Sequence, residues 1–422
     1  MTESSSKSPL PRIATHSTLS DQSPTEPAVR VDVWLCAQFC FIGVVALLGW
    51  NFILGELGVL IDAFGAPYGT WVSMCYSLLI NAGQLLLVFI GNKFRFAPRF
   101  DVGCIGMGTS QILIAIVAVT WARSSQTAGF VMGCILVGVF GFSNAMMESS
   151  MFGLAAMCEA RCMTWIMVGE GLAGIIQLPL NLLVKVVLES MNVSNVPYTK
   201  LVVFFAISML INYSIVPVFR WCTMKHPYMQ HVFAVERGRE KFSLRQSLQR
   251  PLRSILRDTL PQAFNAWINF VVTFVVFPWL VFRMSPSSLS VADFGAYVVY
   301  TFQVFDTIGR FAPSLSVRLG KRAVRWVTLS RVIFIPIFFL CVHVNVPPFN
   351  QDWFRFVVMA LLALTNGVCI TWIMIHGPTQ VPEDRQEEQE VAGYTMAFAL
   401  INGIFIGSLL ATLIEAVGPY SA

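Results

Sequence analysis

Residues 33–61 read VWLCAQFCFIGVVALLGWNFILGELGVLI and carry one charged side chain, Glu56. A helix rises about 1.5 Å per residue, so about 20 apolar residues cover the roughly 30 Å hydrocarbon core of a bilayer. That length distinguishes a helix that spans a membrane from one that lies in a water-soluble core. The stretch therefore predicts a transmembrane helix.

Apolar runs of this kind recur along the chain. They lie near 33–61, 69–91, 101–121, 127–157, 162–190, 199–219, 259–283, 295–316, 326–347, 353–377 and 391–418. Of the 422 residues, 56% are hydrophobic and 12% charged, against about 25% charged in soluble domains. Strands of a membrane β-barrel alternate apolar and polar residues, which these runs do not. The sequence predicts an all-α polytopic membrane protein with about 11 transmembrane helices.

The cations are distributed unevenly between these spans. With a cytoplasmic N-terminus, the inner loops hold Lys93, Arg95, Arg99, Arg161, Arg318, Lys321, Arg322, Arg325 and Arg385, and the outer loops hold Arg123, Lys200 and Arg283. Cytoplasmic loops of membrane proteins carry the excess of Lys and Arg. We therefore expect a cytoplasmic N-terminus and, after an odd number of spans, an extracellular C-terminus.

Residues 1–32 are rich in Ser, Pro and Thr. Such a composition does not bury enough apolar surface to order, so we expect a disordered cytoplasmic tail. No cleavable signal peptide is expected, because the polar leader lacks a short apolar region before a cleavage site. The tail has no acidic dileucine pattern, which favours the plasma membrane over an endosomal membrane and leaves both open.

The longest connection between spans, residues 220–258, is basic. It carries Arg220, Lys225, Arg237, Arg239, Lys241, Arg245, Arg250, Arg253 and Arg257 against three acids. A basic cytoplasmic loop is typical of contact with anionic headgroups, and no nucleic-acid partner is expected. The loop divides the spans into an N-terminal bundle, 33–219, and a C-terminal bundle, 259–418. This six-plus-five plan suggests a major-facilitator-like transporter, expected to be a monomer, with its site near the bilayer midplane.

Charged residues within spans are costly and tend to face a partner or a wet cavity. Asp306 and Arg310 are four residues apart in one span, so they share a helix face and can pair. Such a pair either neutralises itself so that the helix can insert, or binds a solute. Gln303 and Thr307 add polarity nearby, which favours a solute site.

Three acids occupy other spans. Glu148 has no cation in its own helix, so it must find one across the bundle, bind a solute or remain protonated. Glu170 belongs to a polar stripe with Gln177 and Asn181, which indicates either interhelical hydrogen bonds or a site. Glu56 is expected to extend to the membrane interface.

Several motifs resemble the equilibrative nucleoside transporter family. They are Leu48-Gly49-Trp50-Asn51-Phe52, with Gly49 in place of a proline; Met147-Glu148-Ser149-Ser150 through Ala156; Met167-Val168-Gly169-Glu170-Gly171; Phe305-Asp306-Thr307-Ile308-Gly309-Arg310; and Thr365-Asn366-Gly367 with His376-Gly377-Pro378. Their order along nearly the whole chain makes the resemblance specific.

The resemblance implies passage of nucleosides or nucleobases by alternating access. Asp306 and Arg310 would contact the sugar hydroxyls, since a carboxylate accepts and a guanidinium donates hydrogen bonds. Trp50 would face the base or pack in the core, with Asn51 beside it. The implied cavity lining further includes Phe277 of span seven and Gln303.

Two positions depart from the family pattern. Glu148 and Glu170 stand where family members have Gln. A carboxylate loses the two amide donors and gains a titratable proton, so base selectivity can change and proton symport becomes an open alternative.

Other functions are less well supported. A membrane-embedded enzyme would need a converging nucleophile and base or a metal set. The five histidines show no paired-ligand spacing, and neither a metal nor a cofactor is expected. The main alternative is a transporter of organic cations or monoamines on the same fold, because Glu148, Glu170 and Asp306 could hold a positive solute. The sequence does not rank the solutes.

Overall fold

The computed structural model describes residues 30–238, 248, 250–315, 318–382 and 385–417. The compact unit that contains the helices begins at Val31. Its secondary structure in these ranges is helical, without β-strands. Most of the predicted disordered tail, 1–29, lies outside the described residues. So do 239–247 and residue 249 of the basic loop.

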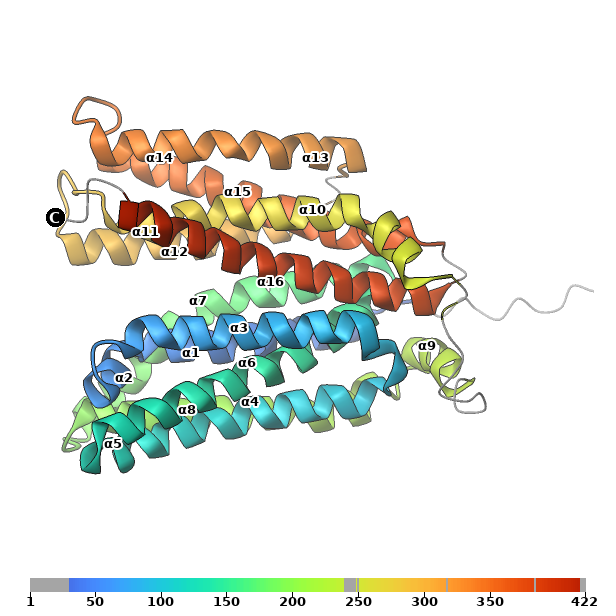
Figure 1. Ribbon diagram of the computed structural model, residues 1–422, viewed down its shortest axis with the longest axis horizontal. Coiled ribbons are helices and arrows are strands. Elements are labelled where there is room, and N and C mark those ends of the chain that lie inside the picture. Colours follow the sequence, from blue (N-terminus) through green and yellow to red (C-terminus); the bar gives the residue numbers. More distant parts are fainter. Residues whose placement is uncertain (1–29, 239–247, 249, 316–317, 383–384, 418–422) are drawn as a thin grey trace, which may run out of the picture. The chain divides into compact units, whose positions relative to one another are not determined.

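A first helix set, α1 to α8, is drawn blue to green in Figure 1. Its elements are α1 (Val33–Gly55), α2 (Leu57–Phe64), α3 (Tyr68–Ile90), η1 (Gly91–Lys93), α4 (Phe96–Val119), α5 (Trp121–Ser124), α6 (Gln126–Ala156), α7 (Ala160–Ser190) and α8 (Val196–Pro217). Within it α1 packs on α7, and α4 packs on α6 and α8. The π-helical segment η2 (Val218–Thr223) and α9 (Pro227–Gly238) follow.

A second helix set, α10 to α16, is drawn yellow to red in Figure 1. Its elements are α10 (Leu252–Val276), α11 (Trp279–Phe282), α12 (Val291–Arg310), α13 (Lys321–Ser330), η4 (Arg331–Ile333), α14 (Phe334–His343), α15 (Asp352–His376), η5 (Pro378–Gln380) and α16 (Gln386–Val417). Here α10 packs on α16 and α12 packs on α15. The two sets meet where α16 packs on α3 and α6, and where α12 packs on α7.

Ten helices of the described chain are long and apolar enough to cross a membrane. They agree with the predicted spans except at 295–316, which corresponds to α12. That helix is long enough, but polar side chains, among them Gln303, Asp306 and Arg310, leave it outside the ten. The predicted all-α polytopic fold is confirmed, with ten such helices where about 11 were predicted.

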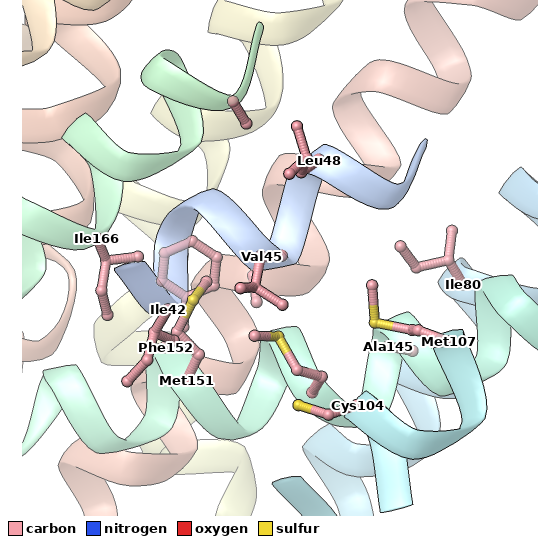
Figure 2. Close-up of a cluster of buried hydrophobic side chains, with 14 of the residues drawn as sticks. Ile42, Val45, Leu48, Ile80, Cys104, Met107, Ala145, Met151, Phe152 and Ile166 are labelled. Carbon is pink, nitrogen blue, oxygen red and sulfur yellow. The ribbon is translucent and has the colours of Figure 1, made fainter. Parts of the chain in front are cut away.

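An apolar core fills the first set. Figure 2 shows Ile42 and Val45 of α1 on the side of the helix that faces α4 and α6, with Met107 and Met151 nearby, whereas Leu48 lies on the opposite side of α1. All five are between 0% and 3% exposed. Because lipid is as apolar as these side chains, close packing rather than exclusion of water favours such contacts. Small residues allow that packing: a methyl group added at Gly169 would overlap the backbone oxygen of Cys40.

Aspartate 32 caps the start of α1. Its Oδ1 accepts a hydrogen bond from the backbone N–H of Leu35 (2.7 Å), one of the helix-end donors that lack a partner within the helix. This hydrogen bond lowers the pKa of Asp32 from its ordinary value of 3.8. The folded protein therefore favours the ionised carboxylate at this cap.

The predicted first span, 33–61, is interrupted at Glu56, which separates α1 from α2. Glu56 is 1% exposed and forms an ion pair with Lys200 (3.0 Å). It also accepts a hydrogen bond from Nδ2 of Asn181 (2.7 Å). The expectation that Glu56 extends to the membrane interface was wrong, because partners on α7 and α8 satisfy the carboxylate inside the protein.

We call the end of the helices where α1, α4 and α16 begin the proximal end, and the end where α12 and α15 begin the distal end (Figure 1). Arg99 of α4 joins the two sets at the proximal end: its Nη2 donates to the Tyr394 hydroxyl oxygen (2.7 Å) and to Oε1 of Glu390 (3.1 Å) on α16. Trp165 of α7 also meets Phe311 edge to face, with ring centroids 5.9 Å apart. The proximal end is therefore closed by contacts between the sets.

Candidate functional site

Arg310 lies at the centre of a buried cluster that joins α7 to α12. Its Nε donates to Oδ2 of Asp306 (2.8 Å), as their four-residue spacing predicts. Its Nη1 donates to Oε2 of Glu170 (2.9 Å) and to the backbone oxygen of Met167 (2.9 Å). The three ionisable residues are 3% to 5% exposed. One guanidinium thus holds two carboxylates from different helix sets.

Tight contacts of small residues bring these helices together. A methyl group added at Gly171 of α7 would come 2.7 Å from Oγ1 of Thr307, and one added at Gly367 of α15 would overlap the backbone oxygen of Asp306. Both glycines stand where the partner helix leaves no room for a Cβ atom. Because these glycines have no side chains, α7 and α15 approach α12 closely, and Glu170 and Asn366 come within reach of its side chains.

A second arginine extends the polar cluster through α15 and α10. Asn366 donates to Asp306, Asn269 donates to Asn366, and Arg331 of η4 donates to Asn269. Sequence reasoning missed Arg331. The available signal was a lone arginine within the apolar run 326–347, where a charge is costly.

The first helix set contributes a separate group of polar side chains. Nε2 of Gln84 donates to Oε2 of Glu148 (2.9 Å), and Nδ2 of Asn144 donates to the hydroxyl oxygen of Tyr76 (2.9 Å). Trp50 stacks on Tyr76 with ring centroids 3.8 Å apart. Glu148 is 5% exposed. Among the described residues it forms no ion pair within 4.0 Å.

The two groups lie near each other. Trp50 is on α1 and Glu148 on α6, and both helices pack on α7, which carries Glu170. The structure therefore gathers Trp50, Glu148 and Glu170 on one side and Asp306 and Arg310 on the other. Two helix sets supply these residues, as expected of a site between bundles.

A cavity of about 370 Å³ lies between α1, α7, α11 and α12 in the distal half of the helices. Its lining includes Asn51, Gly174, Gln177, Leu178, Phe282, Val291, Gly295, Ala296, Val299, Tyr300 and Gln303. The volume is within the range of about 300–1,000 Å³ found for small-molecule sites. Nδ2 of Asn51 is buried and has no hydrogen-bond partner among the described residues. It is a donor that a solute could use.

Gln303 connects this cavity to the charged cluster. It precedes Asp306 by three residues and Arg310 by seven, which places all three on one face of α12. Neither Asp306 nor Arg310 lines the cavity. Both residues lie further along α12 than Gln303, toward its C-terminal end.

Phe277 lies apart from these residues. It stacks on Phe302 with ring centroids 4.5 Å apart and is 9% exposed. It belongs to an apolar cluster with Leu280 and Val298, and the cavity of about 370 Å³ is lined by other residues. Its place in the predicted cavity lining stays a prediction.

Residues 134–416 match the family model described as nucleoside transporter, which is more than half of the chain. The chain belongs to the nucleoside transporter family. Its nucleoside transporter relatives include equilibrative nucleoside transporter 1 of Homo sapiens, 26% identical over 456 residues, which cover 91% of this chain and 97% of the human protein. Equilibrative nucleotide transporter 7 of Arabidopsis thaliana is 22% identical over 399 residues, 89% of this chain and 93% of that protein. The resemblance seen in the motifs is confirmed.

Solved structures share the fold of this nucleoside transporter family member. A major facilitator superfamily proton:xylose symporter has a TM-score of 0.64 at 10% identity and covers 91% of this chain and 95% of its own. The E. coli fucose:proton symporter has a TM-score of 0.60 at 10% identity, with 92% and 93% covered. The major-facilitator-like arrangement is thereby confirmed.

Proposed function

We propose that this protein carries nucleosides across a membrane by alternating access, and that Asp306 and Arg310 bind the ribose hydroxyls. The observation that carries the proposal is the buried Glu170–Arg310–Asp306 cluster between the two helix sets. Ionised groups at such depth are retained where they serve a solute pathway. A carboxylate beside a guanidinium offers an acceptor and a donor to neighbouring hydroxyls.

The moving parts in this proposal are the two bundles, 33–219 and 259–418. The Arg99–Glu390 contact closes the proximal end while the cavity lies in the distal half. A solute would enter past Asn51 and Gln303, reach Arg310, and leave after the proximal contacts separate. Alternating access of this kind needs two packings that differ by a few kcal/mol.

The base of the solute would face the first helix set. Trp50 already stacks on Tyr76, so the pair would offer an aromatic edge or face to a planar base. Glu148 and Gln84 would contact its polar atoms. A carboxyl at position 148 favours bases that present hydrogen-bond donors, and this applies to nucleobases as well as to nucleosides.

Proton coupling through Glu148 is a second candidate, with Glu170 as the other carboxyl. The supporting observation is that Glu148 is buried, contacts Gln84, and forms no ion pair in the described residues. A buried carboxyl without a cation is suited to exchanging a proton. The titratable groups near it are Tyr76 and Glu170, and the latter is paired with Arg310.

We further propose a plasma-membrane monomer with a cytoplasmic N-terminus and an extracellular C-terminus, whose loop 220–258 rests on anionic headgroups. The cations of that loop support this orientation. In this orientation the distal end faces outward. Because the relatives are named as transporters, we assign no enzymatic reaction.

Uptake of labelled adenosine, inosine and uridine in a transport-null cell tests the proposed function. Asp306→Ala and Arg310→Ala should each abolish saturable uptake while surface protein remains. Asp293→Ala is the matched control, because Asp293 is an exposed acid on the same helix. Wild-type uptake equal to that of empty vector for nucleosides and bases would refute the proposal.

A transporter of organic cations remains the alternative, supported by Glu148, Glu170 and Asp306. The same assay separates the two. Excess nucleoside should compete with labelled nucleoside, whereas excess monoamine should not. Competition by monoamines alone would favour the cation transporter.

A further inference from the structure

Three hydrogen bonds connect Arg331 to Asp306 through two amide side chains. Nη1 of Arg331 donates to Oδ1 of Asn269, Nδ2 of Asn269 donates to Oδ1 of Asn366 (2.9 Å), and Nδ2 of Asn366 donates to Oδ1 of Asp306 (2.7 Å). These four residues are 0% to 3% exposed. They form a continuous chain from η4 through α10 and α15 to α12.

The two ends of this chain fix its direction. A guanidinium only donates hydrogen bonds and an ionised carboxylate only accepts them, whereas an amide can turn to do either. With Arg331 at one end and Asp306 at the other, both amides must direct their NH₂ groups toward Asp306. Without Arg331, Asn269 could turn its NH₂ group away from Asn366, and Thr273, which also donates to Oδ1 of Asn366 (2.8 Å), would lose its contact with Arg331; Asn366 would then be held less firmly against the carboxylate.

We propose that Arg331 is a positioning residue for the Asp306 carboxylate, on which it acts through Asn269 and Asn366. The proposal rests on the proposed function, in which Asp306 accepts hydrogen bonds from sugar hydroxyls. Asn366 holds Oδ1 of Asp306, and Arg310 holds Oδ2. The orientation of both oxygens, and so of the lone pairs that remain for a solute, depends on this support.

The anchor end of the chain is itself held firmly. Nη2 of Arg331 donates to Oγ1 of Thr273 (2.7 Å) and to the backbone oxygen of Leu362 (3.3 Å). Nε of Arg331 donates to Oγ1 of Thr365 (3.2 Å). These partners come from α10 and α15, on either side of the 3-10 turn that carries Arg331. The guanidinium therefore has a single orientation from which to direct Asn269.

Charge supports the same assignment. Arg310 is shared by two carboxylates, Glu170 and Asp306, so this group alone carries an excess negative charge when all three are ionised. Arg331 supplies the balancing positive charge, yet it forms no ion pair with any carboxylate in the described residues within 4.0 Å. A buried arginine surrounded by neutral acceptors is costly. Its connection to Asp306 explains why an arginine is present at this position despite the cost of burying it.

Uptake kinetics of labelled uridine and adenosine test the proposal in the full-length chain. Arg331→Met removes the donors, and the KM should rise about tenfold while Vmax per surface copy stays within about threefold. Arg331→Lys keeps a donor-only charged group and should restore much of the affinity. Asn269→Asp keeps a partner for Arg331 but removes the donor to Asn366, and should raise the KM at least about threefold.

Arg355→Met is the matched control. Arg355 is a buried arginine of the same helix set, 5% exposed. It donates to the backbone oxygens of Ser285, Phe349 and Cys341 and to Asp352. Its loss should reduce surface protein and leave the KM unchanged. A rise in KM equal to that of Arg331→Met would overturn the proposal.

The remaining outcomes are also decisive. A KM of Arg331→Met within about twofold of the wild type overturns the positioning role. If that variant does not reach the surface, Asn269→Asp decides in the same way. If the wild type shows saturable uptake and the variants have the wild-type KM, the positioning role is refuted and the proposed function is not. Absence of wild-type uptake instead refutes the proposed function, and the positioning role with it.

Discussion

Glu170 of α7 accepts a hydrogen bond from Nη1 of Arg310 of α12 at 2.9 Å, and both side chains are almost fully buried. The two residues belong to different helix sets. Arg310 therefore contacts Asp306 in its own helix and Glu170 in the other helix set at the same time. Any movement that separates α7 from α12 must break this contact or carry it along.

Removing the charge of Glu170 should weaken both stability and transport. Glu170→Ala leaves Arg310 without one partner, and breaking a buried ion pair costs about 3 kcal/mol or more. Glu170→Gln retains a hydrogen-bond acceptor and should fall between the alanine variant and the wild type. Thermal unfolding in detergent and uptake measure the two effects. Glu189→Gln, exposed on the same helix, should change neither, and an equal loss there would contradict the prediction.

Glu148→Gln should remove any dependence of transport on a proton gradient. A protonophore should reduce wild-type uptake, whereas the variant should be insensitive, because an amide carries no titratable proton. The measurement is initial uptake between about pH 5.5 and 8. A wild-type response that is flat over this range, and unaffected by the protonophore, would rule out coupling and leave an equilibrative carrier.

Gly367→Ala should destabilise the second helix set. The added methyl group would overlap the backbone oxygen of Asp306, so α15 and α12 must separate, at a cost of about 1–3 kcal/mol. Transport should fall with it, because Asn366 would move from Asp306. Gly58→Ala is the control, since nothing lies within 4 Å of its added methyl group. Equal unfolding temperatures for the two variants would refute the prediction.

The proximal closure should depend on Arg99 and Glu390 together. Arg99→Gln and Glu390→Gln each remove the ion pair, so the double variant should show little further loss of uptake or stability. Residues in contact typically show interaction energies of about 0.5–3 kcal/mol in such cycles. The measurement is unfolding temperature and Vmax for the four proteins. Additive losses would show that the two residues act separately.

Asp32→Ala should cost about 1 kcal/mol at neutral pH through loss of the α1 cap. The folded protein lowers the pKa of Asp32, so the stabilisation is present above the unfolded pKa. It is lost as the pH falls through the lower, folded pKa. Unfolding temperatures of wild type and variant should therefore converge at acid pH. Asp32→Asn should show no such pH dependence, and a constant difference between wild type and Asp32→Ala would contradict the linkage.

The sequence alone predicted the membrane helices and the Asp306–Arg310 pair. Both follow from local rules: apolar length sets a span, and a four-residue spacing sets a shared helix face. The pairing of Arg310 with Glu170 could not be derived in this way, because it depends on which faces of α7 and α12 meet. Glu148 and Trp50 were selected as candidates, but their contacts with Gln84 and Tyr76 arise from packing between helices.

Arg331 and Glu56 show where sequence reasoning was incomplete. Both are charged residues in apolar runs, and the same cost argument that selected Asp306 applies to them. Glu56 was placed at the interface because it lies near the end of a span. Its partner Lys200 is remote in sequence. An exposed acid at a helix end can therefore be told from a buried, paired acid only when the position of the opposite charge in space is known.

The polarity of α12 has a consequence for how the protein enters the membrane. Asp306 and Arg310 would make this helix a poor candidate for release into lipid by itself. Glu170 has already been synthesised when α12 emerges, whereas Asn366 of α15 has not. We therefore expect α12 to be retained at the insertion machinery, beside α7, until α15 arrives, so that integration of these helices is a joint event during biogenesis.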